Sequence, residues 1–283
     1  HSADTLLQPE GSALNYFDMA SDPLSLAAER ATLCLFLRGD LAPLTRSYAL
    51  VLPKSEVLQM RDAMPHNRTD WPWLAWYARL GTQVADAAPA GVTWSGRFPE
   101  VYGLASADVR NLLAASPSAP LPTAGDGAVT LDKSSGTFAL NTPRTSGGFA
   151  EGGSVDAGAL VFDVGGTAAT VWVSSLDGKP IKTSARLLLT HLTDVQNSGI
   201  RYAQQSRKTL LAWGGMPHLV RNGKAEIRLA VKRAKDFNVY AIATSGRRIA
   251  AVPTSVVKDR LAFTASVDAQ PETATLLYEI VRK

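Results

Sequence analysis

The stretch Ala225-Glu-Ile-Arg-Leu-Ala-Val231 largely alternates apolar and polar side chains with a period of two. Successive side chains of an extended strand point to opposite faces, so Ile227 and Leu229 share one face and Glu226 and Arg228 share the other. This pattern predicts a strand with one face buried in a core and the other face in solvent.

Strand signals of this kind fill the C-terminal part of the chain. Turn pairs such as Asp177-Gly178 and Asn222-Gly223 separate them, and no long helical pattern interrupts them. Nine or more short strands without a long helix predict an antiparallel β-sandwich over residues 126–283. The other strands expected are 130–132, 136–141, 159–163, 169–174, 185–192, 238–243, 260–265 and 275–281.

Ahead of the sandwich, strand and helix patterns alternate, so the fold class expected for the whole chain is mixed. Strands expected at 46–53, 91–95 and 100–104 alternate with helices expected at 54–64, 70–88 and 106–115. This order predicts a small α/β domain of the Rossmann or flavodoxin-like kind over residues 45–115. Residues 116–125 hold three prolines among small polar residues and predict a linker.

The first segment, residues 1–44, predicts one helix over about 22–37. Ser21-Asp22-Pro23 supplies cap residues followed by a proline, which the first turn of a helix tolerates, and Gly39 ends the pattern. The apolar stripe is wider than a small domain normally buries. We therefore expect four leucines of this helix to leave an apolar surface that meets other protein: Leu24, Leu26, Leu33 and Leu37.

Composition excludes several classes of protein. The chain has 283 residues, 46% of them hydrophobic and 19% charged, which is enough apolar material for real cores and argues against global disorder. No run approaches the roughly 18 apolar residues that a membrane helix needs. The net charge of +4 is uneven, because the excess of Lys and Arg lies in residues 124–283. There the charges are spread singly along the expected strands rather than clustered, which argues against nucleic-acid binding. The lone Cys34 excludes an internal disulfide and is expected to be buried.

Several segments of the C-terminal part resemble those of a known group of enzymes. Gly136-Thr-Phe-Ala-Leu-Asn-Thr-Pro-Arg-Thr145 resembles a segment found in the C-terminal regions of large bacterial glycoside hydrolases that have a TIM-barrel catalytic domain. Further similar segments follow in the same order: Val173-Ser-Ser-Leu-Asp-Gly-Lys-Pro180, Arg186-Leu-Leu-Leu-Thr190, Val195-Gln-Asn-Ser-Gly199 and Trp213-Gly214.

The N-terminal part adds to this resemblance. Tyr16-Phe-Asp-Met-Ala-Ser-Asp-Pro23, followed by Arg38-Gly-Asp40, looks like the last helix and exit of such a barrel. The α/β unit is similar to the accessory domain of the family 42 β-galactosidases. A complete barrel needs about 250 residues, so residues 1–44 have room only for a remnant of its end. The resemblance thus implies the C-terminal part of a longer enzyme, periplasmic or secreted, whose partner is the catalytic barrel of the same polypeptide.

The sequence offers no constellation that would make the chain itself catalytic. Glycoside hydrolysis needs two carboxylates flanking the bond, whereas the Asp and Glu residues here fall in caps, turns and strand positions such as Glu226 and Glu279, both expected to face solvent. No Gly-x-Ser-x-Gly elbow and no zinc-ligand spacing is found. Gly147-Gly148 and Gly165-Gly166 precede no helix and predict tight turns rather than phosphate loops. No cofactor is expected, and only calcium near Asp126 or Asp177 stays open.

Six residues are candidates for contact with a carbohydrate. Trp71 and Trp73 either stack on sugar rings or pack in a core or interface, and Trp213, beside two glycines, is expected in a loop. Asn141, Arg144 and Thr145 belong to the segment that matches best. A plain hairpin does not need an arginine, so Arg144 either makes a forked contact with a carboxylate or backbone carbonyls, or reaches a sugar hydroxyl.

Two functions follow from these expectations. In the first, the chain is the non-catalytic C-terminal region of a carbohydrate-active glycoside hydrolase that supports the barrel and shapes one rim of its cleft. In the second, it is a stand-alone carbohydrate-binding or protein-interaction β-sandwich module.

Overall fold

The computed structural model describes residues 22–44, 47–54, 79–86, 101–102, 128–132, 134–267 and 274–283. The chain divides into two compact units, one made of residues 1–41 and 134–283 and the other of residues 42–133. In the part of the chain that the structure describes, no helix is long and apolar enough to cross a membrane.

The smaller unit contains a three-stranded sheet. Strand β1 (Ser47–Pro53) pairs in parallel with β2 (Arg79–Ala85) and antiparallel with β3 (Val101–Tyr102). The strand expected at 46–53 is confirmed. The helix expected over 70–88 is wrong where β2 lies, because Thr82 and Val84 are β-branched and Gly81 disfavours a helix by about 1 kcal/mol.

The other predicted elements of this unit cannot be compared in the same way. The expected strand at 91–95 and the helix at 106–115 lie outside the described residues, as does all but Lys54 of the helix at 54–64. Within the described residues, no Rossmann-type α/β unit is present.

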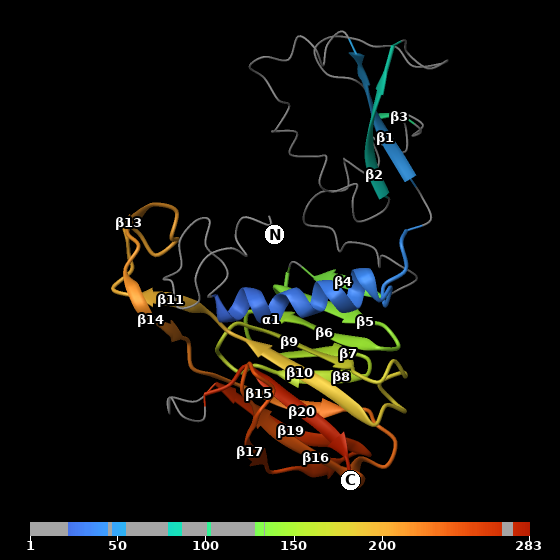
Figure 1. The fold of residues 1–283 in the computed structure, drawn as a ribbon, viewed down its shortest axis with the longest axis vertical. Helices are drawn as coiled ribbons and strands as arrows, with labels where there is room; N and C mark the ends of the chain where they lie inside the picture. The colour runs from blue at the N-terminus through green and yellow to red at the C-terminus, as the bar shows by residue number, and fades with distance from the viewer. Residues whose placement is uncertain are drawn as a thin grey trace. The chain divides into compact units, whose positions relative to one another are not determined.

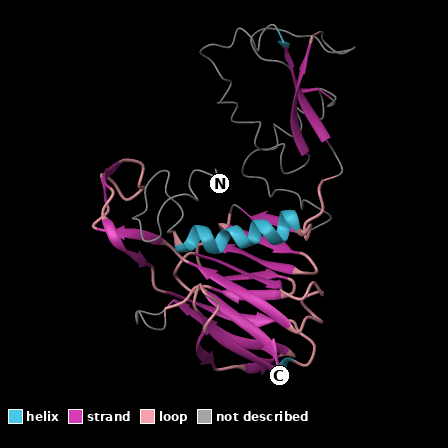
Figure 2. Cartoon of the chain, viewed as in Figure 1, coloured by secondary structure: helices cyan, strands magenta, loops and turns pink. Residues whose placement is uncertain are grey.

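The larger unit is mainly β, as predicted, and its strands pair antiparallel (Figures 1 and 2). One sheet has eight strands in the order β17-β16-β20-β10-β9-β6-β5-β4, and its edge strand β4 is contributed by residues that precede 134. The other sheet has five strands in the order β18-β19-β15-β8-β7. The bounds for the eight-stranded sheet are β4 Val129–Asp132, β5 Thr137–Asn141, β6 Thr145–Ala150, β9 Ala169–Ser175, β10 Arg186–Leu192, β16 Phe237–Ile242, β17 Arg248–Val252 and β20 Leu277–Arg282. For the five-stranded sheet they are β7 Ser154–Ala157, β8 Leu160–Asp163, β15 Gly223–Leu229, β18 Ser255–Val257 and β19 Arg260–Val267.

The main core lies between the two sheets. Alternate residues of β15 and β19 are buried, as the period of two in 225–231 predicts. They pack against the inward side chains of the larger sheet in one cluster. Each fully buried large apolar side chain contributes about 1.5–3 kcal/mol relative to exposure, so this alternation fixes which face of each strand turns inward. The largest members include Leu160, Phe162, Leu187, Leu189, Ile227, Leu229, Phe263 and Ile280.

The prediction of a tight turn at Gly147-Gly148 is wrong, because both residues lie inside β6. A Cβ added to Gly147 would sit 2.3 Å from Cβ of Trp172, and one added to Gly148 would sit 1.9 Å from the carbonyl oxygen of Phe138. The neighbouring strands β5 and β9 therefore approach β6 so closely that only glycine fits. A pair of glycines in a sequence does not distinguish this case from a turn.

Helix α1 (Pro23–Thr32) covers the outer face of the eight-stranded sheet (Figure 1). The Asp22 side chain caps its start by accepting from the amide of Leu24 at 2.9 Å, and a π-helical turn, η2 (Leu33–Leu37), continues it to Gly39. Its inner side buries Ala27, which packs in a second cluster with Trp172 and Leu188 of the sheet. The predicted helix over 22–37, the buried Trp172 and the buried Cys34 are confirmed.

Candidate functional site

The end of the helical segment is fastened to the sheet through Asp40, whose side chain has 0% exposure. Arg38 donates to both carboxylate oxygens of Asp40, from Nε at 2.9 Å and from Nη2 at 2.5 Å. Arg144 pairs with the same carboxylate at 2.9 Å, and the Thr145 hydroxyl donates to it at 2.7 Å. We call Arg38, Asp40, Arg144 and Thr145 the Asp40 clamp.

Backbone carbonyls complete the clamp. Arg38 also donates to the carbonyl of Ser175 at 2.5 Å, and Arg144 donates to the carbonyl of Arg38 at 3.1 Å. Burial by itself would raise the pKa of Asp40, but the hydrogen bonds from Arg38 and Thr145 and the charges of both arginines outweigh it and lower that pKa. Asp40 is therefore ionised at neutral pH and holds η2 to the β5–β6 turn.

The clamp contains two of the six sequence candidates. Arg144 makes the forked contact with a carboxylate and a carbonyl that was one of its two expected roles. Thr145 is buried, and the side chain of Asn141 lies against Gly158, where an added Cβ would come within 2.2 Å of its amide nitrogen. Trp71 and Trp73 lie outside the described residues. Asp40 was not singled out as a site residue, although Arg38-Gly-Asp40 was among the matching segments.

The outward face of the helical segment is strongly apolar. Leu26, Leu33, Phe36 and Leu37 are 46%, 50%, 79% and 72% exposed, respectively. Three of the four leucines expected to leave an apolar surface do so, while Leu24 is partly buried against the second cluster. We call Leu26, Leu33, Phe36 and Leu37 the outer stripe of the helix.

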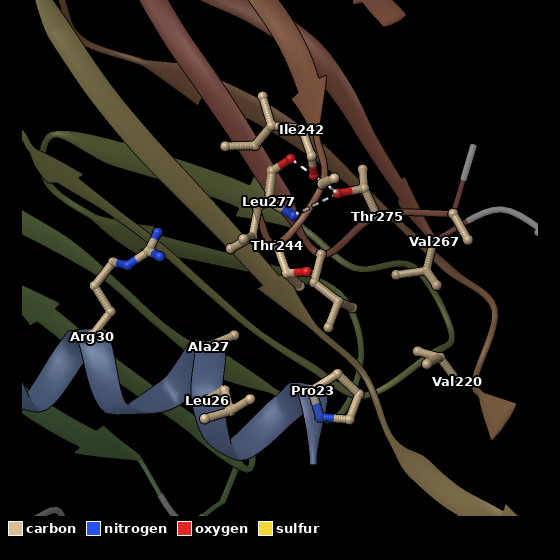
Figure 3. Close-up of a pocket in the computed structure, with 13 residues that line it drawn as sticks. Pro23, Leu26, Ala27, Arg30, Val220, Ile242, Thr244, Val267, Thr275 and Leu277 are labelled. Atoms are coloured by element: carbon tan, nitrogen blue, oxygen red, sulfur yellow. Dashed lines mark hydrogen bonds between the residues drawn. The ribbon is translucent and has the colours of Figure 1, made fainter. Parts of the chain in front are cut away.

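An apolar pocket of about 300 Å³ adjoins the outer stripe between α1 and the sheet (Figure 3). Leu26 belongs to both, and the other walls are mostly apolar, from Val220, Ile242, Val267 and Leu277. The polar groups are few: the Thr275 hydroxyl donates to the carbonyl of Ile242 at 2.6 Å, and Arg30 extends from α1 along one wall. Among the described residues, Arg30 forms no ion pair.

A separate lobe, residues 194–221, projects beside the two sheets (Figure 1). It consists of two ribbons, β11 (Val195–Ser198) with β14 (Gly215–Val220) and β12 (Arg201–Tyr202) with β13 (Leu210–Ala212). Trp213 lies in the connection between the ribbons and is 46% exposed, and Asn197 donates to its carbonyl at 2.9 Å. Trp213 thus lies in an exposed loop, as expected. This loop joins β13 and β14, whereas the Asp40 clamp lies at the end of the helical segment and the β5–β6 turn.

The lobe also carries a charged cluster that sequence reasoning missed. Arg207 forks onto the Asp194 carboxylate at 3.1 and 2.7 Å, and Arg221 reaches it at 3.2 Å. Hydrogen bonds from Arg207 and the charges of both arginines lower the pKa of Asp194 against the effect of its burial. Thirteen or more residues separate these three groups in the sequence, so no local motif announces them.

Carboxylates elsewhere in the two antiparallel sheets are arranged in two ways. Glu279 was expected to face solvent but is buried, because Arg186 and Arg248 each donate to one of its oxygens at 2.8 Å. Asp163 and Glu226 lie opposite each other on β8 and β15, at a shallow surface depression. Within the described ranges, no three His, Cys, Asp or Glu side chains gather as metal ligands would.

No family model matches the chain, and searches of curated proteins and of solved structures return no significant match.

Proposed function

We propose that this chain is the non-catalytic C-terminal region of a glycoside hydrolase, and that α1 and η2 dock it against the catalytic barrel of the same polypeptide. The observation that carries the proposal is the outer stripe, whose most exposed member, Phe36, is 79% exposed. Contiguous exposed apolar surface of this kind marks protein contacts. The sequence resemblance to the C-terminal regions of barrel hydrolases supplies the identity of the partner.

Rigidity of the stripe supports a docking role. The inner side of α1 packs on the sheet through Ala27, and the Asp40 clamp holds the other end of the helical segment. A surface held at both ends loses little conformational entropy on binding, which favours association. The proposal includes the Rossmann or flavodoxin-like α/β domain over residues 45–115, which would lie between the docking helix and the sandwich in sequence.

The pocket beside the stripe supports a specific mode of contact. Its apolar walls fit one aliphatic or aromatic side chain of the partner, and Arg30 stands at one wall without an acidic partner in the described residues. A hydrophobic anchor in a pocket with a charged group beside it is typical of the centre of an interface. We expect the partner to present an acidic residue close to its apolar anchor.

Substitutions on the stripe are expected to abolish docking. The gene region upstream of this chain is sequenced, the barrel it encodes is expressed separately, and the two parts are co-purified. Replacing Phe36 and Leu37 by serine should lower the affinity at least about 100-fold, because two central anchors are lost. The matched control is Leu176→Ser, an exposed leucine outside the helix. Docking unaffected by the double substitution, or no barrel upstream, would refute the proposal.

The isolated chain is expected to hydrolyse no glycoside. The proposal places the catalytic barrel outside this chain. In addition, Asp40 and Glu279 are paired with arginines, and such ionised carboxylates have no proton to transfer as a general acid. The measurement is turnover of aryl glycosides and polysaccharides by the pure chain. Turnover that is lost in Asp163→Asn or Glu226→Gln would contradict the prediction and make those two opposed carboxylates the active site.

The second candidate function, a stand-alone carbohydrate-binding or interaction module, is favoured by one observation, the exposed indole of Trp213 on a fixed loop. The upstream reading frame separates the two candidates, because a module would need no catalytic barrel encoded before it.

A further inference from the structure

We infer that the lobe at 194–221 binds an acidic saccharide, a ring with several hydroxyl groups and a carboxylate, in the depression beside Arg207. This depression encloses about 550 Å³ and is lined by Gln196, Tyr202, Gln204, Gln205, Arg207 and Arg221. The inference is independent of docking through the outer stripe, since it concerns other elements of the larger unit.

The charge of the depression selects an anion. Two guanidinium groups, of Arg207 and Arg221, face the single carboxylate of Asp194, so the cluster keeps one positive charge in excess. Asp194 also holds Arg207 in place through its forked contact, and a pre-organised guanidinium loses less entropy when it binds a second carboxylate. Asp194 takes one pair of N–H groups from Arg207, so a uronate would accept from the other N–H groups of the two guanidiniums of Arg207 and Arg221.

The remaining walls fit a ring with hydroxyl groups better than a bare anion. A primary amide both donates and accepts, as a sugar hydroxyl does, and three glutamines line the depression. With its oxygen turned toward Arg207, the amide of Gln196 accepts from Nη1 at 3.0 Å, which leaves its NH₂ group for other partners. Arg207 lies over the ring of Tyr202, with its Cζ 5.9 Å from the ring centroid, so the tyrosine helps to hold the guanidinium in place. An inorganic anion would accept from the arginines and the amide NH₂ groups but would leave the amide oxygens without a donor.

The backbone at Arg207 is strained in a way that suits this role. Its φ of 56° lies in the left-handed region, where Gly, Asn or Asp cost less than arginine. The strained turn is closed by the Arg207 amide, which donates to the carbonyl of Gln204 at 3.0 Å. Strain of this kind is found at ligand clamps, and here it directs a long cationic side chain toward Asp194 and the depression.

The test is calorimetric titration of the full chain with tetragalacturonate and with its methyl ester, which keeps the ring and removes the charge. We expect the acid to bind at least about 10-fold more tightly than the ester, since the ester loses the charge-assisted hydrogen bonds that the carboxylate accepts. Arg221→Gln should weaken binding of the acid by a similar factor. Its matched control is Arg228→Gln, an exposed arginine of the sandwich outside the lobe.

Four outcomes with these ligands and arginine variants would overturn the inference. The acid and the ester could bind with equal affinity, or inorganic phosphate at equal concentration could displace the acid completely. Arg221→Gln and Arg228→Gln could lower the affinity for the acid equally, or the chain could bind no acid up to about 10 mM. An affinity for the acid that falls in Trp213→Ala but not in Arg221→Gln would also overturn the inference, because the site would then lie at the indole of Trp213. Circular dichroism verifies that each variant is folded. Docking to the barrel should be unchanged in Arg221→Gln, which separates failure of this inference from failure of the proposed function.

Discussion

Replacing Asp40 by alanine is expected to lower the free energy of unfolding of the larger unit by about 3 kcal/mol. Asp40 is fully buried and accepts from Arg38, Arg144 and Thr145, so its removal leaves two guanidinium groups facing each other without their carboxylate. Removing one partner of a buried ion pair costs about 3–5 kcal/mol, and the partial exposure of both arginines places the expected value at the lower end. Urea denaturation followed by circular dichroism measures it.

The matched control for this experiment is Asp236→Ala. Asp236 pairs with Arg233 on the surface, where such a pair contributes about 0–1 kcal/mol. Arg144→Ala should cost about 1–3 kcal/mol, because Asp40 keeps Arg38, and the double variant should cost less than the sum of the two single variants. Equal effects of Asp40→Ala and Asp236→Ala, or strict additivity of Asp40→Ala and Arg144→Ala, would show that the clamp does not hold the helical segment.

Lowering the pH should reduce the stability that the Asp40 clamp contributes to the folded chain. The pKa of Asp40 is lowered on folding, so the stability that it contributes is present above its unfolded pKa, near 3.9, and is lost as pH falls through the folded value. The Asp40→Ala variant should therefore approach the wild type in stability as pH falls below the unfolded pKa and through the lowered folded pKa.

Acidification from pH 7 to pH 4 is expected to lower the free energy of unfolding of the larger unit by about 3 kcal/mol through the titration of one group, His191. Its side chain is fully buried on the same face of β10 as Leu187 and Leu189, which belong to the core between the sheets. Neither ring nitrogen has a hydrogen-bond partner among the described residues. Burial lowers the pKa of His191 from 6.5 to about 4.

The direction of the effect follows from the lowered pKa. Between pH 6.5 and pH 4 the unfolded chain binds a proton at His191 and the folded chain does not, so protonation favours unfolding. The stability is fully present above pH 6.5 and declines until the folded group also titrates. Replacing His191 by leucine removes this part of the pH dependence and leaves stability at pH 7 at least as high, because two unpaired buried nitrogens are removed.

Thr190→Val is the matched control for His191→Leu. Thr190 is the preceding residue of β10 and is equally buried, and its hydroxyl likewise has no hydrogen-bond partner within the described residues, but it does not titrate in this range. The free energy of unfolding of the Thr190→Val variant should still fall by the full amount between pH 6.5 and pH 4. A decline of the same size in His191→Leu would show that other groups cause it and that the His191 prediction is wrong.

Candidate sites whose residues are close together in sequence were predicted, and those that depend on contacts between distant residues were missed. Three members of the outer stripe, Leu26, Leu33 and Leu37, were predicted because the apolar stripe of the helix is wider than a small domain normally buries, whereas Phe36 was not named. Arg144 was selected because a turn after a strand has no need of a guanidinium group. The Asp194 cluster and the clamp residue Asp40 were missed. Arg207 lies 13 residues from Asp194 and Thr145 lies 105 residues from Asp40, and no local spacing encodes such contacts, although Arg38 is only two residues from Asp40.

The sequence by itself determined the antiparallel β architecture of the larger unit and the helix at 22–37, because periods of 2 and 3.6 residues are local properties that burial of one face enforces. Only the tertiary structure decided how single residues are used. Gly147-Gly148 became the centre of a strand because β5 and β9 approach it too closely for a Cβ. Glu279 became buried because Arg186 on the neighbouring strand β10 and Arg248 on β17, two strands away, neutralise it. Each outcome depends on atoms that are distant in sequence, and close approach and charge neutralisation are properties of the packed chain.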